Sequence, residues 1–165
     1  MNSPYLKFAG VLLCALMPTG LICVANEKQG DSAQDLPEVK AAVISCKGLI
    51  DDGLYKSIRR RTQIALGRGA KYIIYEISTY GGLLQSGDDI SKYLILDVEK
   101  KAHTVAYVTT EAISAGAMIS VSCEDVLMKE NTTIGCSAPI VMGGKLEGEE
   151  REKMESFVRA TFKRA

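Results

Sequence analysis

Residues 71–82 read KYIIYEISTYGG, and this stretch decides the fold. Its first seven residues are rich in Ile and Tyr, which are enriched in strands, and Gly81-Gly82 marks the turn that follows. Residues 103–116, HTVAYVTTEAISAG, repeat the pattern, because an apolar strand again runs into a group of small residues. Short apolar strands that alternate with helices indicate a parallel sheet with crossover helices, so the chain is predicted to be α/β.

The rest of the chain extends this alternation on both sides. Four strands are expected, at residues 39–46, 71–77, 103–109 and 125–128. Four helices are expected, at residues 51–66, 83–98, 113–123 and 149–164. In a parallel sheet, ligands bind beyond the carboxyl ends of the strands. Residues 78–82 and 112–116 both follow such ends and are therefore the segments in which to look for chemistry.

The N-terminus has the pattern of a targeting segment. Lys7 is followed by 8–25, a run without any charged residue, which is typical of a secretory signal peptide. An uncleaved N-terminal membrane anchor is the alternative, although Pro18 and Gly20 interrupt a continuous span. Residues 1–25 are therefore predicted to be a signal peptide or anchor, 26–37 a polar linker and 38–165 the folded domain.

Composition excludes several classes of function. The 20 basic and 20 acidic side chains cancel, which argues against a nucleic-acid partner. A single His and the absence of any C-x-x-C pair argue against a zinc site. The three cysteines beyond residue 25 are expected to be buried free thiols: Cys46, Cys123 and Cys136. Cys136 as a nucleophile is a weaker alternative.

Ser114 is the candidate nucleophile. It lies between an expected strand and an expected helix, where unpaired backbone N–H groups and the positive end of the helix dipole gather. Backbone N–H groups of Gly81, Gly82 and Ala115 are candidates for an oxyanion hole, since glycine presents an N–H without a Cβ. The alternatives are an ordinary helix N-cap for Ser114 and an ordinary turn for Gly81-Gly82.

A serine nucleophile needs a base, and the only His is badly placed. His103 begins the strand that Ser114 follows, roughly 20 Å away along the strand. A lysine can act instead when desolvation favours its neutral form.

Helical geometry selects among the lysines. The apolar face of helix 149–164 is formed by Met154, Phe157, Val158 and Phe162. At about 100° per residue, Lys153 flanks this face and Lys163 lies on the solvent side. A lysine with its stem along apolar surface and no catalytic role is the alternative for Lys153.

Three segments, taken together, resemble the NfeD family. They are Tyr80-Gly81-Gly82, residues 112–116 (AISAG) and residues 131–140 (NTTIGCSAPI). This family comprises membrane-bound serine proteases of the Clp protease/crotonase fold, related to signal peptide peptidase SppA. The resemblance covers residues 38–165. It implies Ser114 as nucleophile, Gly81-Gly82 as the glycine turn and Lys153 as general base.

The chain also departs from the family pattern. Tyr80 stands where the family usually has Pro, and the chain stops inside the lysine helix, so the domain is expected to be incomplete at its C-terminus. The membrane spans and small β-barrel of longer members are missing as well.

The resemblance implies an exported Ser/Lys-dyad endopeptidase at the periplasmic or extracytoplasmic face of the membrane. Its substrates would be hydrophobic segments of membrane-associated proteins, such as a stomatin-like partner, and it would form a homo-oligomer. No metal or organic cofactor is implied. The alternatives are a catalytically silent protein-binding module and, more weakly, a crotonase-type acyl-CoA enzyme.

Overall fold

The computed structural model describes residues 38–140 and 147–165. The expected signal peptide or anchor and the expected linker lie outside the described residues. In chain order the elements are β1 (Ala41–Lys47), α1 (Asp52–Gly67), β2 (Tyr72–Thr79), α2 (Leu84–Tyr93), the π-helical turn η1 (Leu94–Val98), β3 (His103–Ile113), α3 (Ala115–Val121), β4 (Asp125–Met128), β5 (Thr133–Gly135) and α4 (Gly148–Arg164). None of the described helices is long and apolar enough to cross a membrane.

The strands form one parallel sheet in the order β1-β2-β3-β4. The long strand β3 has two partners on the same side: β4 pairs with residues 105–108, and β5 pairs with residues 111–113. All of these pairs are parallel, so the carboxyl ends of the strands gather at one edge of the sheet. The predicted α/β class with a parallel sheet and crossover helices is confirmed.

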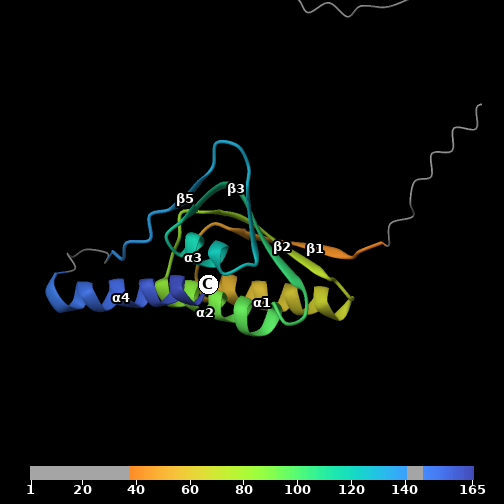
Figure 1. Ribbon diagram of the computed structural model, residues 1–165, viewed down its shortest axis with the longest axis horizontal. Helices are drawn as coiled ribbons and strands as arrows, with labels where there is room; N and C mark the ends of the chain where they lie inside the picture. Colours follow the sequence, from red (N-terminus) through yellow and green to blue (C-terminus); the bar gives the residue numbers. More distant parts are fainter. Residues whose placement is uncertain (1–37, 141–146) are drawn as a thin grey trace, which may run out of the picture. The chain divides into compact units, whose positions relative to one another are not determined.

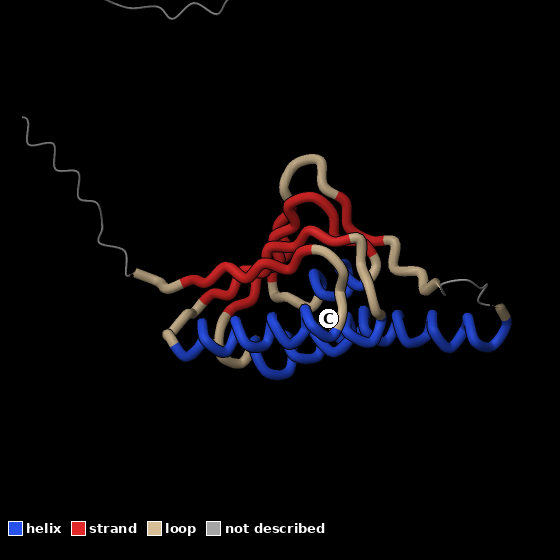
Figure 2. The backbone as a smooth tube through the Cα atoms, turned by 180° about the vertical axis from the view of Figure 1, so that it is seen from behind, coloured by secondary structure: helices blue, strands red, loops and turns tan. Residues whose placement is uncertain are grey.

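The helices lie on one side of the sheet (Figures 1 and 2). Side chains that alternate along β2 point into the layer between sheet and helices, and Ile73, Tyr75 and Ile77 are buried there. Ile58 of α1 and Met118 of α3 join them in the same apolar core. This alternation is the period of two that a strand imposes.

The structure corrects several expected boundaries. β3 continues to Ile113, well beyond residue 109, and α3 begins at Ala115. The polar residues Thr110 and Glu111 suggest that the strand has ended, but β5, which was not expected, pairs with this last part and extends the sheet. The helix expected at residues 83–98 begins one residue later, at Leu84, and changes to the π-helical turn at Leu94.

Candidate active site

Two loops are joined at the carboxyl edge of the sheet. The N–H of Ile50, in the loop after β1, donates to the carbonyl of Gly81 at 3.0 Å. The N–H of Leu83 donates back to the carbonyl of Ile50 at 2.7 Å. The Gly81-Gly82 turn after β2 is therefore held by main-chain bonds to the neighbouring loop.

Steric contacts explain why this turn needs both glycines. Gly81 has φ of +106°, and a Cβ built on it would lie 2.8 Å from the Cβ of Ser114. A Cβ on Gly82 would overlap the carbonyl oxygen of Ile50. Glycine at both positions lets the turn approach the Ile50 loop on one side and Ser114 on the other.

Ser114 occupies a sharp turn between β3 and α3. Its φ of 55° and ψ of −117° are uncommon for a residue other than glycine, and its side chain does not cap the helix. The structure therefore does not support the N-cap alternative, in which the backbone would be extended and the hydroxyl bonded to the first turn. Such a turn exposes a serine hydroxyl at the end of a strand, as in a nucleophile elbow.

Main-chain contacts hold this turn in place. The N–H of Ser114 donates to the carbonyl of Gly135 at 2.8 Å. The carbonyl of Ser114 accepts from the N–H of Ala117 at 3.0 Å and from Ser137 Oγ at 3.2 Å. In the part of the chain that the structure describes, the Ser114 hydroxyl itself makes no hydrogen bond. The backbone is fixed and the hydroxyl remains available.

The three N–H groups expected for an oxyanion hole differ in their contacts. The N–H of Gly81 donates to Thr79 Oγ1 at 2.9 Å, so it is already engaged in the turn. Ala115 is the first residue of α3, and its N–H has no intrahelical carbonyl to bond. Gly82 and Ala115 are thus the better donors, and Gly81 shapes the turn beside Ser114.

Lys153 lies near the first turn of α2. It is an exposed residue of α4 and lines a groove of about 400 Å³ together with Leu84, Gln85, Met154 and Phe157. Leu84 and Gln85 begin α2 directly after the glycine turn. Between the described residues, no hydrogen bond joins Lys153 to Ser114. The structure thus brings Ser114 and the glycine turn into contact. It places Lys153 beside the start of α2, the helix that follows the glycine turn.

His103 is at the other end of the sheet, as expected from its position in the sequence. It begins β3, and its Nε2 lies 2.6 Å from Asp125 Oδ2 while its Nδ1 lies 3.2 Å from Glu124 Oε1. The hydrogen bond with Asp125 raises the pKa of His103 above its ordinary value, with Glu124 adding to the effect. Its contacts join β3 to the start of β4, at the opposite end of β3 from Ser114.

The cysteine predictions are confirmed in two cases and wrong in one. Cys46 and Cys123 are buried, and burial raises the pKa of Cys46 to about 12, which keeps its thiol protonated. Cys136 is exposed, and it directly follows the end of β5 with φ of 53°.

Sequence patterns gave no role to two residues that hold the site together. Thr79 bonds the N–H of Gly81, and its Oγ1 also donates to the carbonyl of Gly48. Ser137 bonds the carbonyl of Ser114. Thr79 was recognisable as the last β2 residue on the buried face before the turn, whereas no spacing signals the contact of Ser137.

Solved structures establish the fold independently. A lysine-to-alanine mutant of the 1510-N membrane-bound stomatin-specific protease, in complex with a substrate peptide, is 24% identical with a TM-score of 0.65, over 76% of this chain and 60% of that chain. A serine-to-alanine mutant of that protease is 23% identical with a TM-score of 0.66, over 78% and 65% of the two chains. A ClpP1 mutant from Listeria monocytogenes is 19% identical with a TM-score of 0.56, over 72% and 65%. The fold is therefore Clp protease-like, as predicted.

A curated relative and a family model give the family. The membrane protein NfeD1b of Bacillus subtilis (strain 168) is 28% identical over 112 residues, which are 68% of this chain and 25% of the relative. The chain thus spans about a quarter of the relative's length. The model of the NfeD1b N-terminal domain matches residues 40–165. The chain belongs to the NfeD1b N-terminal domain family.

Proposed function

We propose that the protein is a serine endopeptidase in which Ser114 is the nucleophile and Lys153 the general base. The observation that carries the proposal is the conformation of Ser114: a strained turn fixed by main-chain bonds, with a hydroxyl that neither caps the helix nor bonds elsewhere among the described residues. Strain at a non-glycine residue costs on the order of 1–3 kcal/mol and clusters at functional sites. A structural serine would not need it.

The chemistry follows from the groups at this edge. The neutral amine of Lys153 would take the proton of Ser114 Oγ while Oγ attacks a peptide carbonyl carbon. The N–H groups of Gly82 and Ala115 would bond the oxyanion of the tetrahedral intermediate. The lysine would then protonate the leaving amine, leaving an acyl-enzyme, and would activate the water that releases the acyl group.

Lys153 is exposed, and among the described residues it has no hydrogen bond to Ser114, so substrate binding has to complete the dyad. The groove between α2 and α4 is lined by Leu84, Met154 and Phe157, which suit an apolar side chain. A peptide seated there would cover Lys153, exclude water and favour its neutral form. Apolar segments of polypeptides are therefore the proposed substrates.

The solved relatives support this choice. They are a stomatin-specific protease, studied as variants that lack one lysine or one serine, which are the residue types of the proposed dyad. By analogy we propose a stomatin-like membrane protein as partner and membrane association. From the uncharged run 8–25 we propose a location at the periplasmic or extracytoplasmic face, and we also propose homo-oligomerisation. A fusion to a reporter that is active only outside the cytoplasm tests the location, and light scattering tests the oligomeric state.

Labelling by a fluorophosphonate probe tests the nucleophile. We expect the wild-type chain to be labelled and Ser114→Ala not to be labelled. Ser78→Ala is a matched control, since Ser78 has an exposed hydroxyl at the same edge but bonds Thr110 at 2.6 Å. Labelling that survives Ser114→Ala would overturn the assignment. Peptide binding without labelling would instead support a silent binding module.

A second pair of variants tests the base. Lys153→Ala is expected to slow labelling by at least about a hundredfold, the scale of general-base contributions. Lys163→Ala removes a lysine from an exposed position of the same helix and is expected to label like the wild type. Equal rates for the two variants would exclude Lys153 as the base.

A further inference from the structure

Helix α4 carries Lys153 but has few buried residues to hold it. Of its 17 residues, only Val158 and Thr161 are buried. Most of the others are charged or partly exposed, so apolar burial alone fixes the helix weakly. The rotation and the axial position of α4 decide where Lys153 lies, so the contacts that fix this helix also place Lys153.

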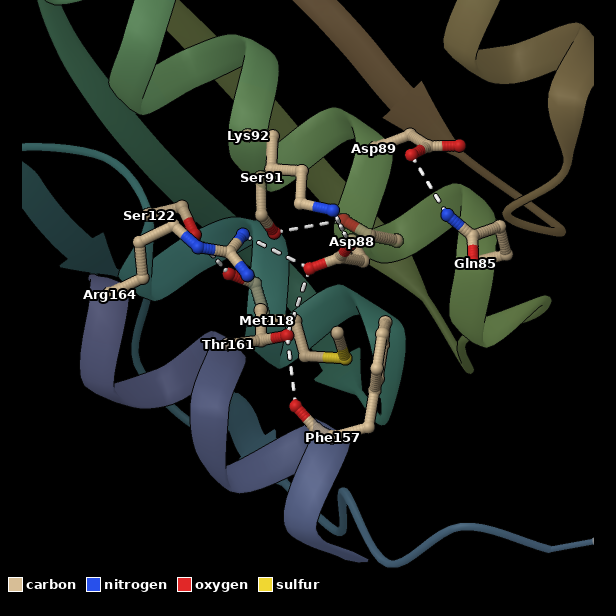
Figure 3. A network of polar contacts seen from close by, with 11 residues as sticks. Gln85, Asp88, Asp89, Ser91, Lys92, Met118, Ser122, Phe157, Thr161 and Arg164 are labelled. Atoms are coloured by element: carbon tan, nitrogen blue, oxygen red, sulfur yellow. Dashed lines mark hydrogen bonds and ion pairs between the residues drawn. The ribbon is translucent and has the colours of Figure 1, made fainter. Parts of the chain in front are cut away.

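A buried carboxylate on α2 joins the two helices by hydrogen bonds (Figure 3). The side chain of Asp88 is 0% exposed. Its Oδ1 accepts from Thr161 Oγ1 at 3.0 Å and from a guanidinium N–H of Arg164 at 3.0 Å. Both donors belong to α4.

The second oxygen of Asp88 has a partner within its own helix. Lys92 Nζ lies 2.6 Å from Asp88 Oδ2 as an ion pair, although the geometry is not that of a hydrogen bond. Burial by itself raises the pKa of the Asp88 carboxyl, but the contacts with Lys92, Arg164 and Thr161 outweigh burial and hold the pKa below its usual value. Asp88 therefore stays ionised at neutral pH, and a buried charge of this kind requires hydrogen-bond donors, which α4 supplies.

Helical spacing connects this contact to the groove. Leu84 and Asp88 are four residues apart and lie on the same face of α2, as Phe157 and Thr161 do on α4. Leu84 and Phe157 line the groove together. Lys153 lies four residues, or about one turn, before Phe157, and about 12 Å from Thr161 along the helix axis at 1.5 Å per residue. The contact between Asp88 and Thr161 thus fixes which turn of α4 faces the start of α2.

We infer that Asp88 is a positioning residue that, through Thr161 and Arg164, locks α4 against α2 so that Lys153 stays beside Leu84 and Gln85, at the start of α2. The inference rests on the proposed function, because it assigns Asp88 a role in placing the proposed base. Between the described residues, the Asp88 side chain makes no hydrogen bond to Ser114 or to the groove side chains, so its influence on the chemistry passes through α4.

A pair of substitutions at Thr161 separates the hydroxyl from the volume of the side chain. Thr161→Val keeps the shape and removes the donor to Asp88, whereas Thr161→Ser keeps the donor. Lys92→Gln is the control at Asp88 itself, since it removes the ion pair within α2 and leaves both bonds to α4. The full chain is used, and circular dichroism confirms that each variant folds.

The readout is the rate of fluorophosphonate labelling at Ser114, resolved into the maximal rate kinact and the half-saturating concentration KI. Thr161→Val is expected to lower kinact about tenfold with KI within about twofold, because the base is displaced while probe binding is unchanged. Thr161→Ser and Lys92→Gln are expected to stay within about twofold of the wild type. Asp88→Asn is expected to behave like Thr161→Val.

The outcomes distinguish this inference from the proposed function. A wild-type chain that is not labelled at Ser114 overturns the proposed function and, with it, a positioning role toward catalysis. A labelled wild type with unchanged kinact in folded Thr161→Val overturns the inference alone. Equal losses in Thr161→Val and Thr161→Ser, or a loss in Lys92→Gln as large as in Thr161→Val, also overturn it, since the bond to α4 would then not be responsible.

Discussion

The Ser114 turn and helix α4 are held in place by different means. The backbone of Ser114 is held by hydrogen bonds to Gly135 and Ala117, and its neighbour Gly81 is held by one backbone bond to Ile50 in the loop after β1. Lys153 lies on a helix that is joined to α2 through the buried side chain of Asp88. Ser114 therefore belongs to the edge of the sheet, whereas the helix that carries Lys153 is attached to the rest of the domain by a few side chains.

This difference indicates how each half should respond to change. The backbone around Gly81 and Gly82 is packed too closely to accept a further atom, so substitutions of these glycines should destabilise the whole fold. A helix held by side-chain bonds should loosen locally while the sheet stays intact. The predictions below run from the largest expected effect to the smallest.

Gly82→Ala should give the largest loss of stability. The new Cβ would overlap the Ile50 backbone, and forcing the two loops apart is expected to lower the free energy of unfolding by about 3 kcal/mol. Urea denaturation measures the change. Gly67→Ala is the control, because a Cβ there meets nothing within 4 Å. Equal free energies of unfolding for the two variants would show that the turn accepts a Cβ at residue 82 and is not part of the rigid core.

Thr161→Val should act on α4 alone. Losing one bond to a charged, buried acceptor is expected to cost about 1–2 kcal/mol, and the cost should appear as faster amide hydrogen exchange in α4. Exchange in β2 and β3 should not change. Uniformly faster exchange through sheet and helix would mean that α4 and the sheet unfold as one unit.

Ser114→Gly should stabilise the protein while it removes the nucleophile. Glycine adopts the backbone angles of this turn without strain, so the free energy of unfolding is expected to rise by about 1 kcal/mol. Thermal unfolding of this variant beside Ser114→Ala, which keeps the strain, measures the difference. No gain over Ser114→Ala would show that the turn is unstrained.

His103 should make a small, pH-dependent contribution at the far end of the sheet. Its pKa is raised in the folded state above the ordinary value of 6.5, so its stabilising effect is complete below about that pH and is lost as the pH rises through the raised pKa. Urea denaturation across this range should show the loss in the wild type, and His103→Gln should remove it. An identical pH dependence in the two proteins would exclude the contacts with Glu124 and Asp125 as its source.

Sequence reasoning succeeded where periodicity is strong. The strand pattern of residues 71–77 and the glycine pair predicted β2 and its turn. Of the apolar face predicted for α4, Val158 is buried, whereas Phe157 and Phe162 are exposed. It failed at β5, because Thr133–Gly135 is too short to show a pattern and becomes a strand only by pairing with β3.

The contacts of the site depended on the tertiary structure. The carboxylate of Asp88 looks like a surface group in the polar sequence of α2, and only the fold brings Thr161 and Arg164 to it. The φ of Ser114 likewise has no sequence signature, since small neighbours also suit an N-cap. The prediction that Lys153 flanks the buried face depends only on helical spacing, whereas its relation to Ser114 depends on how two helices pack.

The divided pairing of β3 has a consequence for the loop between β4 and β5. β4 and β5 both lie against β3, so the chain leaves that strand after Met128 and returns to it at Thr133 (Figure 1). The excursion between them begins and ends on one rigid strand. A change in the length of this loop is therefore expected to leave the strand end that precedes Ser114 in place.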